Sequence, residues 1–246
     1  MFFPAGGVRR GMPTELRPGV WLLELSGVNA YLVKDGDDLV LVDTGTPFDA
    51  GRIRSAVTEA GHRVSDIDRV LITHYDLDHV GGFGRLDLDS AAVFAATPDA
   101  DYLTKRRSPP LDNHKGALQR ATRFLLNAPP EVHRVEDGDH IGSFVAYRTP
   151  GHTPGHVAYV SEELSVAFVG DLVFEEDGAF TASPWLLSYD TDTVNESIHD
   201  FADREPAVEC VCPGHGLPFL KNGAVRLAEL GQRIEDREEG VTEVTA

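Results

Sequence analysis

The chain has 246 residues, of which 41% are hydrophobic and 25% are charged, a composition typical of a globular protein. Glycine and proline are scattered along the sequence without any low-complexity tract, which excludes fibrous and disordered classes. The formal net charge of −18 opposes contact with phosphate backbones and anionic lipids. We therefore expect neither a nucleic-acid partner nor a membrane partner.

The sequence contains no sign of export or membrane insertion. No apolar run reaches the roughly 18 residues that a membrane helix needs, and the first 19 residues lack the apolar segment of a signal peptide. The two cysteines, Cys210 and Cys212, stand one residue apart, too close to link distant parts of a fold. These features predict a cytoplasmic protein in a reducing compartment.

The first third of the chain is expected to form short strands followed by a helix and a buried strand. Branched and apolar residues separated by Gly, Asn or Asp predict strands over Val20–Leu25, Ala30–Lys34 and Leu39–Asp43. Apolar residues at helical spacing predict a helix over Phe48–Ala60, which Gly61 would end. The next apolar run, Ile67–Thr73, predicts a strand that leads directly into His74.

The second half repeats this layout. Strands are predicted over Phe144–Tyr147, Val157–Val160, Val166–Val169 and Val208–Cys212, and helices over Thr193–Asp203 and Gly223–Glu238. The elements alternate without a strict βαβ rhythm. This pattern favours two sheets packed face to face with helices outside them.

Residues 98–130 differ from the rest of the chain because they carry an excess of positive charge. They contain three acids and six bases, namely Lys105, Arg106, Arg107, Lys115, Arg120 and Arg123. A helix is predicted over His114–Asn127. The arginines could cover a site and hold a substrate carboxylate, or they could form a solvated face that pairs with acids elsewhere.

Histidine and aspartate gather where apolar runs end. Residues 73–82 read T-H-Y-D-L-D-H-V-G-G, which places His74, Asp76, Asp78 and His79 in one short loop after a strand. Three further candidates, His152, Asp171 and His215, also follow apolar runs and have glycine neighbours. Taken singly, each residue could cap a strand or form a turn. Together, imidazoles and carboxylates in this arrangement predict a metal site.

This order of residues resembles the metallo-β-lactamase superfamily, whose pattern is H-x-H-x-D-H, a glycine-flanked histidine, an aspartate after an apolar strand, and a late histidine. The resemblance implies an α/β fold, a four-layer αβ/βα sandwich of two mixed β-sheets with outer helices. It also implies one domain over residues 1–246, in which the insert at about 98–130 is a variable segment that could form a lid. The activity it implies is hydrolysis assisted by two metal ions.

Carried over residue by residue, the resemblance assigns two ligand sets. The first metal ion would be bound by His74 and His152, the second by Asp78, His79 and His215, and Asp171 would bridge the two ions. Asp43, in the family's V-D-T-G signature, and His156 would lie behind the ligands and orient them.

The chain departs from the family at one position, since Asp76 stands where the family has its second histidine. Asp76 could be a carboxylate ligand of the first metal, a hydrogen-bonding neighbour that leaves that site weak, or a sign that only the second metal stays bound. A carboxylate lowers the positive charge of the centre and favours harder ions. We expect two divalent ions, zinc first, with iron or manganese as the alternatives that Asp76 admits.

The predicted activity is the hydrolysis of a small ester, thioester or lactone by a metal-bound hydroxide. Asp78 would orient the hydroxide and then protonate the leaving group, and glyoxalase II-like thioesterases are the nearest comparison. The substrate would be a small molecule; the sequence identifies no substrate-binding residue and no oligomeric state. Two alternatives stay open: a mononuclear iron dioxygenase of thiols or persulfides on the same fold, and a binding protein that has lost turnover through Asp76.

Overall fold

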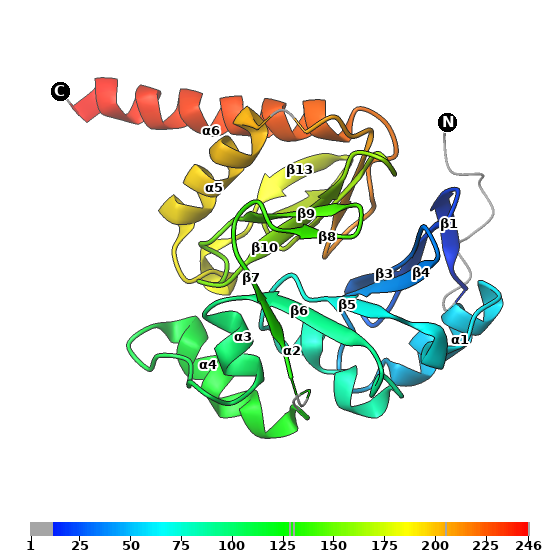
Figure 1. The fold of residues 1–246 in the computed structure, drawn as a ribbon. Coiled ribbons are helices and arrows are strands. Elements are labelled where there is room, and N and C mark those ends of the chain that lie inside the picture. Colours follow the sequence, from blue (N-terminus) through cyan, green and yellow to red (C-terminus); the bar gives the residue numbers. More distant parts are fainter. Residues whose placement is uncertain (1–11, 128, 130, 205, 246) are drawn as a thin grey trace.

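The computed structural model describes residues 12–127, 129, 131–204 and 206–245. Residues 1–11, which belong to the segment tested for a signal peptide, and Pro130, the expected end of the insert, lie outside the described residues. Figure 1 shows two sheets that face each other, with α1–α4 outside the sheet built from the first half of the chain and α5 and α6 outside the sheet built from the second half.

The first sheet has seven strands in the order β1 to β7. Their bounds are Thr14–Arg17, Val20–Glu24, Asn29–Asp35, Asp38–Val42, Arg69–Leu71, Ala92–Ala96 and His133–Val135. Strands β1 to β4 form an antiparallel meander, whereas β4 to β7 run parallel. The helices of this half are α1 (Ala50–Glu59), α2 (Leu77–Val80), α3 (Asp99–Leu103) and α4 (His114–Thr122).

The second sheet has five strands in the order β14-β11-β10-β9-β8, and a separate hairpin joins β12 to β13. The bounds of β8 to β14 are His140–Ile141, Phe144–Arg148, Val157–Ser161, Val166–Gly170, Val173–Glu176, Ala179–Ala182 and Cys210–Pro213. The two helices are α5 (Thr191–Asp203) and α6 (Gly223–Thr245). Short 3-10 helices lie at Val64–Asp66, Phe83–Arg85, Arg123–Leu125 and Trp185–Leu187.

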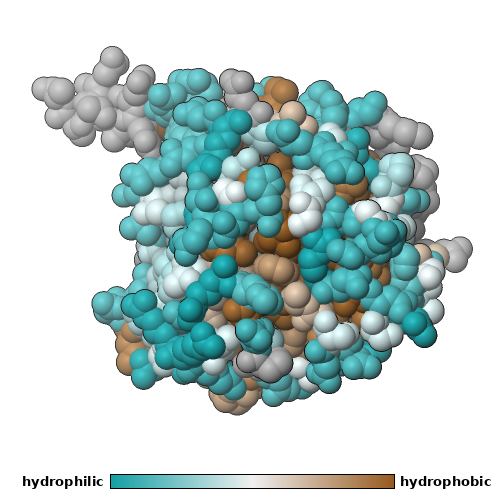
Figure 2. Space-filling view, viewed as in Figure 1, coloured by the Kyte–Doolittle hydropathy of each residue, from teal (hydrophilic) through white to brown (hydrophobic). Residues whose placement is uncertain are grey.

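Three apolar clusters hold these layers together. One packs α1 against the first sheet, one fills the space between the two sheets, and one packs α5 and α6 against the second sheet. Cys210 and Cys212 both belong to the middle cluster, as expected for two residues on one face of a strand. The face seen in Figure 2 is largely hydrophilic, with hydrophobic side chains mainly in the central band between the two halves. The four-layer sandwich predicted from the resemblance is therefore confirmed.

Every strand and helix predicted from apolar periodicity is present, with ends that shift by up to seven residues. Several short elements were not predicted, namely β1, β6, β7, β8, the β12–β13 hairpin, α2 and α3. The hairpin turns at Asp177-Gly178, where both residues have positive φ, 50° and 82°, as a two-residue type I′ turn requires. The Asp-Gly pair was therefore a usable turn signal. Helix α6 continues to Thr245, seven residues beyond the predicted end at Glu238.

Within the described residues, no helix combines the length and the apolar composition needed to cross a bilayer.

The topology brings four strand ends to one edge of the sandwich. Strands β4 and β5 are parallel neighbours in the first sheet, and β11 and β14 are parallel neighbours in the second. Parallel neighbours end at the same edge of a sheet, so the residues that follow them lie close together. Backbone hydrogen bonds join the two sheets here, from Val157 N–H to the Thr73 carbonyl (2.9 Å) and from Asn29 N–H to the Gly214 carbonyl (2.8 Å).

Candidate metal centre

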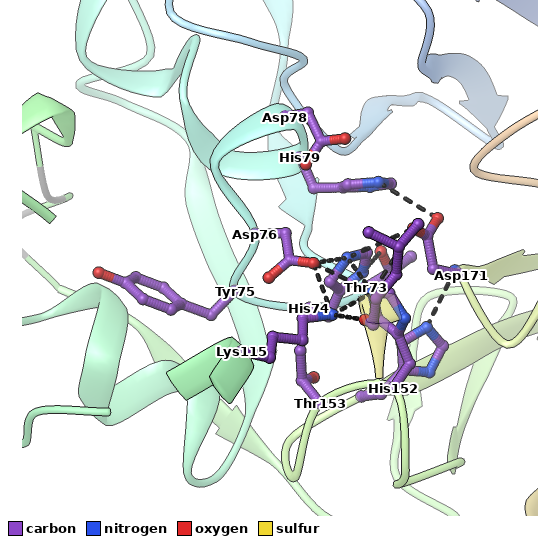
Figure 3. A network of polar contacts seen from close by, with 12 residues as sticks. Thr73, His74, Tyr75, Asp76, Asp78, His79, Lys115, His152, Thr153 and Asp171 are labelled. Carbon is purple, nitrogen blue, oxygen red and sulfur yellow. Dashed lines mark hydrogen bonds and ion pairs between the residues drawn. The ribbon is translucent and has the colours of Figure 1, made fainter. Parts of the chain in front are cut away.

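His74, Asp76 and His152 form a compact group at this edge, which we call the first cluster (Figure 3). The His152 Nε2 atom lies 3.2 Å from His74 Nε2 and 3.0 Å from Asp76 Oδ2. His74 Nε2 and Asp76 Oδ2 are 3.4 Å apart. Both imidazoles are buried, whereas the Asp76 side chain retains 16% exposure toward the surface.

Asp78, His79 and His215 form a neighbouring group, which we call the second cluster. His215 Nε2 lies 3.5 Å from Asp78 Oδ2. His79 is fully buried, whereas the side chains of His215 and Asp78 are 24% and 41% exposed. Access to the second cluster is therefore from the side of Asp78 and His215.

Asp171 lies between the two clusters. Its Oδ1 atom is 3.3 Å from His79 Nε2, and its Oδ2 atom is 3.2 Å from His215 Nε2 and 3.5 Å from His152 Nε2. The backbone N–H of Asp171 donates to His156 Nε2 over 3.1 Å. This bond holds the Asp171 backbone in position directly after the end of β11. The structure thus brings all seven candidate ligands together and places His156 behind Asp171.

Hydrogen bonds behind the imidazoles orient the second cluster. Asp43 Oδ2 accepts from His79 Nδ1 over 2.7 Å and also from the Thr73 hydroxyl. His215 Nδ1 donates to the Gly27 carbonyl over 2.7 Å. Because Nδ1 of each ring is engaged in these hydrogen bonds, Nε2 is the nitrogen that faces the centre and can bind a metal ion. Asp43 does this from a left-handed backbone conformation, φ 59°, which is uncommon outside glycine.

The first cluster has hydroxyl groups in the same supporting positions. His74 Nδ1 lies 3.0 Å from Thr73 Oγ1, and His152 Nδ1 lies 2.7 Å from Ser183 Oγ. The Thr73 hydroxyl donates to Asp43, so its lone pair accepts from the His74 N–H. Neutral hydroxyls therefore support the first cluster, whereas a carboxylate supports the second.

Burial and neighbouring charges keep the first cluster as two neutral imidazoles and one carboxylate. Burial lowers the pKa of His74 well below its usual value, and His79 adds to the effect. Burial and the Lys115 ammonium lower the pKa of His152. Burial opposes the ionised form of Asp76, but Lys115 and the neighbouring imidazoles hold the pKa of Asp76 well below its usual range.

The second cluster has the opposite balance. Burial opposes a charge on His79, yet the Asp171 and Asp43 carboxylates raise the pKa of His79 well above its usual value. Asp171 likewise raises the pKa of His215 against the effect of burial. In return, His79 and His215 hold the pKa of the buried Asp171 well below its usual range. The field at the second cluster therefore favours an added positive charge, which a proton or a metal ion can supply.

The residues of this centre fit a divalent cation. His79 Nε2 and Asp171 Oδ1 are buried and face each other, yet neither atom has a hydrogen-bond partner. A buried polar atom without a partner is costly in a folded protein, and a cation held between these two atoms would satisfy both. A tetrahedral zinc ion with ligands at about 2.1 Å would keep them about 3.4 Å apart, close to the spacing seen in both clusters.

Comparison with known proteins identifies the family. Residues 23–215 match the family model described as the metallo-beta-lactamase superfamily. This chain belongs to the metallo-beta-lactamase superfamily. Membership places it in a superfamily of metallo-hydrolases, as the motif predicted, and the fold implies divalent metal ions.

Individual relatives in the superfamily are distant but cover most of the chain. A probable metallo-hydrolase of Bacillus subtilis, YflN, is 29% identical over 95% of this chain and 97% of its own length. A hydroxyacylglutathione hydrolase of Cereibacter sphaeroides is 33% identical over 88% of this chain and 79% of its own. The crystal structure of the metallo-beta-lactamase family protein TTHA1429 of Thermus thermophilus superposes with a TM-score of 0.71 at 23% identity, covering 94% and 84% of the two chains. The last likeness shows the fold alone.

Lys115 is a residue of the centre that the sequence did not reveal. It lies on α4, is only 5% exposed, and forms an ion pair with Asp76 at 2.8 Å. Gln119, one turn later on α4, donates to the other Asp76 oxygen over 2.6 Å. Their spacing of four residues on a predicted helix was the only signal available, since four residues place two side chains on one helix face.

The arginines of the insert do not reach the centre. Arg106, Arg107 and Arg120 are exposed, and Arg123 donates to Ser108 Oγ over 2.8 Å. None of them lines the pocket above the two clusters. Of the two alternatives for these arginines, a cover that holds a substrate carboxylate or a solvated face, this arrangement favours the solvated face. The basic residue that does face the site is Lys115, which the superfamily motif does not contain.

Asp99 is a second unexpected residue near the centre. Its carboxylate accepts from the Tyr75 N–H, the Gly155 N–H and the Thr153 hydroxyl, at 2.8, 2.8 and 2.6 Å. It thereby joins the loop after β5 to the loop that carries His152. Burial raises the pKa of Asp99 to about 6 despite these donors. The Tyr75 ring itself points away from the cluster (Figure 3).

A pocket of about 260 Å³ opens above the clusters. Its floor includes Asp76, Asp78, Asp171 and the two histidines His152 and His215. The rest of its lining is formed by four leucines and three polar residues, namely Leu77, Leu118, Leu186, Leu187, Lys115, Gln119 and Thr122. The pocket therefore places candidate ligands beside apolar side chains.

Proposed function

We propose that this protein is a metal-dependent hydrolase of a small ester, thioester or lactone. The observation that carries the proposal is the second cluster with Asp171, in which two buried atoms lack a hydrogen-bond partner while Asp78, Asp171 and His215 line a pocket. The relative named hydroxyacylglutathione hydrolase supports the thioester class.

The proposed ligands of a divalent ion are Asp78, His79 and His215, with Asp171 supplying a further carboxylate oxygen. Zinc is the first choice because imidazole and carboxylate in a four-ligand set suit it, and iron or manganese are the alternatives. The first cluster, His74, Asp76 and His152, offers three more ligand atoms within 4.8 Å of one another. The superfamily resemblance gives a capacity of two ions.

A bound divalent ion would lower the pKa of a water molecule and polarise a carbonyl oxygen. The chain itself supplies orientation and proton transfer. Asp78 lines the pocket with 41% of its side chain exposed, so its carboxylate can accept a proton from water and return it to the leaving group. Asp43 and the Gly27 carbonyl hold His79 and His215 in the orientation that binding requires.

The walls of the pocket favour an apolar acyl group. A volume of about 260 Å³ suits a small substrate, and leucine side chains surround the approach to the floor. Leu118 and Leu186 are 63% and 67% exposed, so a bound acyl chain would remove their surface from water. We therefore propose a substrate whose acyl part is apolar and whose carbonyl lies at the second cluster.

One observation favours the dioxygenase alternative. Two imidazoles and one carboxylate, as in the first cluster, are the ligand set of many mononuclear iron oxygenases. Lys115, however, already bonds two of those three groups. We place this function second for that reason, and a binding protein without turnover third.

The test uses protein stripped of metal by a chelator and then reloaded with zinc, iron or manganese. We expect reloading to restore hydrolysis of a p-nitrophenyl ester, an acyl thioester or a lactone that the stripped protein does not cleave. Oxygen uptake on a persulfide by the iron form, without hydrolysis, would instead support the dioxygenase. Inertness of all three metal forms toward every substrate would overturn the enzyme assignment.

A further inference from the structure

We propose that the Lys115 ammonium takes the place of a metal ion in the first cluster, so that the protein binds a single divalent ion, in the second cluster. This inference rests on the proposed metal centre and is independent of the substrate. It concerns which cations occupy the site before any substrate arrives.

The contacts of Lys115 satisfy its ammonium group completely. Its three N–H donors meet three acceptors, His152 Nε2 at 2.7 Å, Asp76 Oδ2 at 2.8 Å and the Leu187 carbonyl. The residue is 5% exposed, and a lysine is buried to this degree only when it is paired. Lys115 is therefore built into the cluster.

The lysine and a metal ion would compete for the same electron pair. His152 Nδ1 lies 2.7 Å from the Ser183 hydroxyl, and with its proton there His152 Nε2 has a single lone pair. That lone pair can accept an ammonium proton or bind a metal ion, but it cannot do both. Repulsion between two cations that share Asp76 Oδ2 acts in the same direction.

Asp76 is the residue that makes this arrangement stable. An imidazole at this position could not form an ion pair with an ammonium, whereas the Asp76 carboxylate does. Gln119 fixes the second carboxylate oxygen and is itself held by the Tyr189 hydroxyl, which donates to Gln119 Oε1 over 2.6 Å. Helix α4 thus supplies two partners to the one residue that departs from the family motif.

The second cluster has no such internal cation. Among the residues that the structure describes, no lysine or arginine pairs with Asp78 or Asp171. His79 Nε2 and Asp171 Oδ1 lack hydrogen-bond partners altogether. A cation from solution therefore has its place in the second cluster, while the first cluster already contains one.

The experiment counts zinc ions. Wild-type protein and Lys115→Met are stripped, incubated with Zn²⁺ alone, freed of unbound ions and measured by elemental analysis and titration calorimetry. We expect about one ion per wild-type chain and about two in Lys115→Met, because methionine keeps the apolar stem and frees His152 and Asp76. Lys105→Met is the matched control, since this exposed lysine of the same insert bonds only the Leu126 carbonyl, and it should stay at the wild-type value.

A second variant guards against a folding defect. Asp76→His removes the ionic partner of Lys115 and restores the second histidine of the family motif, so this variant should also bind a second ion. Circular dichroism melting checks that each variant folds. Two ions per wild-type chain, or one ion in both folded variants, would overturn the role given to Lys115. No bound zinc in any form would overturn the proposed metal centre instead.

Discussion

The two clusters lie side by side but balance their negative charge in different ways. In the first cluster, Lys115 is paired with the single carboxylate, and hydroxyl groups support the imidazoles. In the second, carboxylates surround His79 and raise its pKa against the effect of burial, and Asp43 supports the ring. Similar ligand atoms can therefore lie beside a positive charge in one cluster and beside negative charges in another. The neighbouring charge decides which cluster requires a cation from solution.

The largest effect should come from the group that both clusters share. We expect Asp171→Ala to lower kcat/KM at least about 10³-fold, equivalent to about 4 kcal/mol of transition-state stabilisation. Among the described residues, no other carboxylate contacts histidines of both clusters. Steady-state kinetics on the best substrate and zinc analysis would measure it. Asp200→Ala, on the exposed side of α5, is the control. Wild-type turnover in Asp171→Ala would refute the shared role.

A smaller effect, on zinc affinity, should distinguish the carboxylate behind the second cluster from the hydroxyl behind the first. Asp43→Asn keeps a residue that tolerates the left-handed conformation but removes the charge behind His79. We expect zinc affinity to fall about 10-fold to 100-fold in competition titrations against a chelating dye. Ser183→Ala removes the hydroxyl behind His152 and should leave that affinity within about twofold, because it supports the first cluster. Equal losses in both variants would contradict the comparison.

The smallest effect should come from the pocket wall, which belongs to neither cluster. Leu118→Ala should raise KM for apolar acyl substrates about fivefold with little change in kcat, the loss expected for about 1 kcal/mol of apolar contact. Leu111→Ala is the matched control, since Leu111 is equally exposed in the same insert but does not line the pocket. If the two variants have equal KM values, the acyl group does not bind along this wall.

The strand ends could be predicted from the sequence because a polar residue follows each apolar run, and at Asp171 and His215 a glycine stands beside that residue. His74, Asp171 and His215 illustrate this, since β5, β11 and β14 end within a few residues of them. Parallel pairing within each sheet then gathers these residues at one edge. The pattern of an apolar run followed by a polar residue therefore identified candidate ligands that are far apart in the chain.

Lys115 and Asp99 could not be predicted in the same way. Their roles depend on how α3 and α4 pack over the sheet edge, and the local sequence does not show how close these helices come to the candidate ligands. The positive net charge of the insert suggested a role for its arginines. An arginine on a helix surface stays solvated, however, unless the helix packs with that face toward the protein interior. Strand β6 was missed because its alanine-rich sequence, Ala92–Ala96, gives a weak strand signal.

The position of Lys115 and Gln119 on α4 shows that the identity of the ligand residues and the number of ions they bind are separate properties. The candidate ligands follow strands of the shared fold, whereas the groups that bind Asp76 come from a surface segment outside both sheets. Such segments change in length and packing more freely than the strands they connect. The number of ions held by this kind of centre can therefore change through an insertion or a shifted helix, while every ligand keeps its place in the chain.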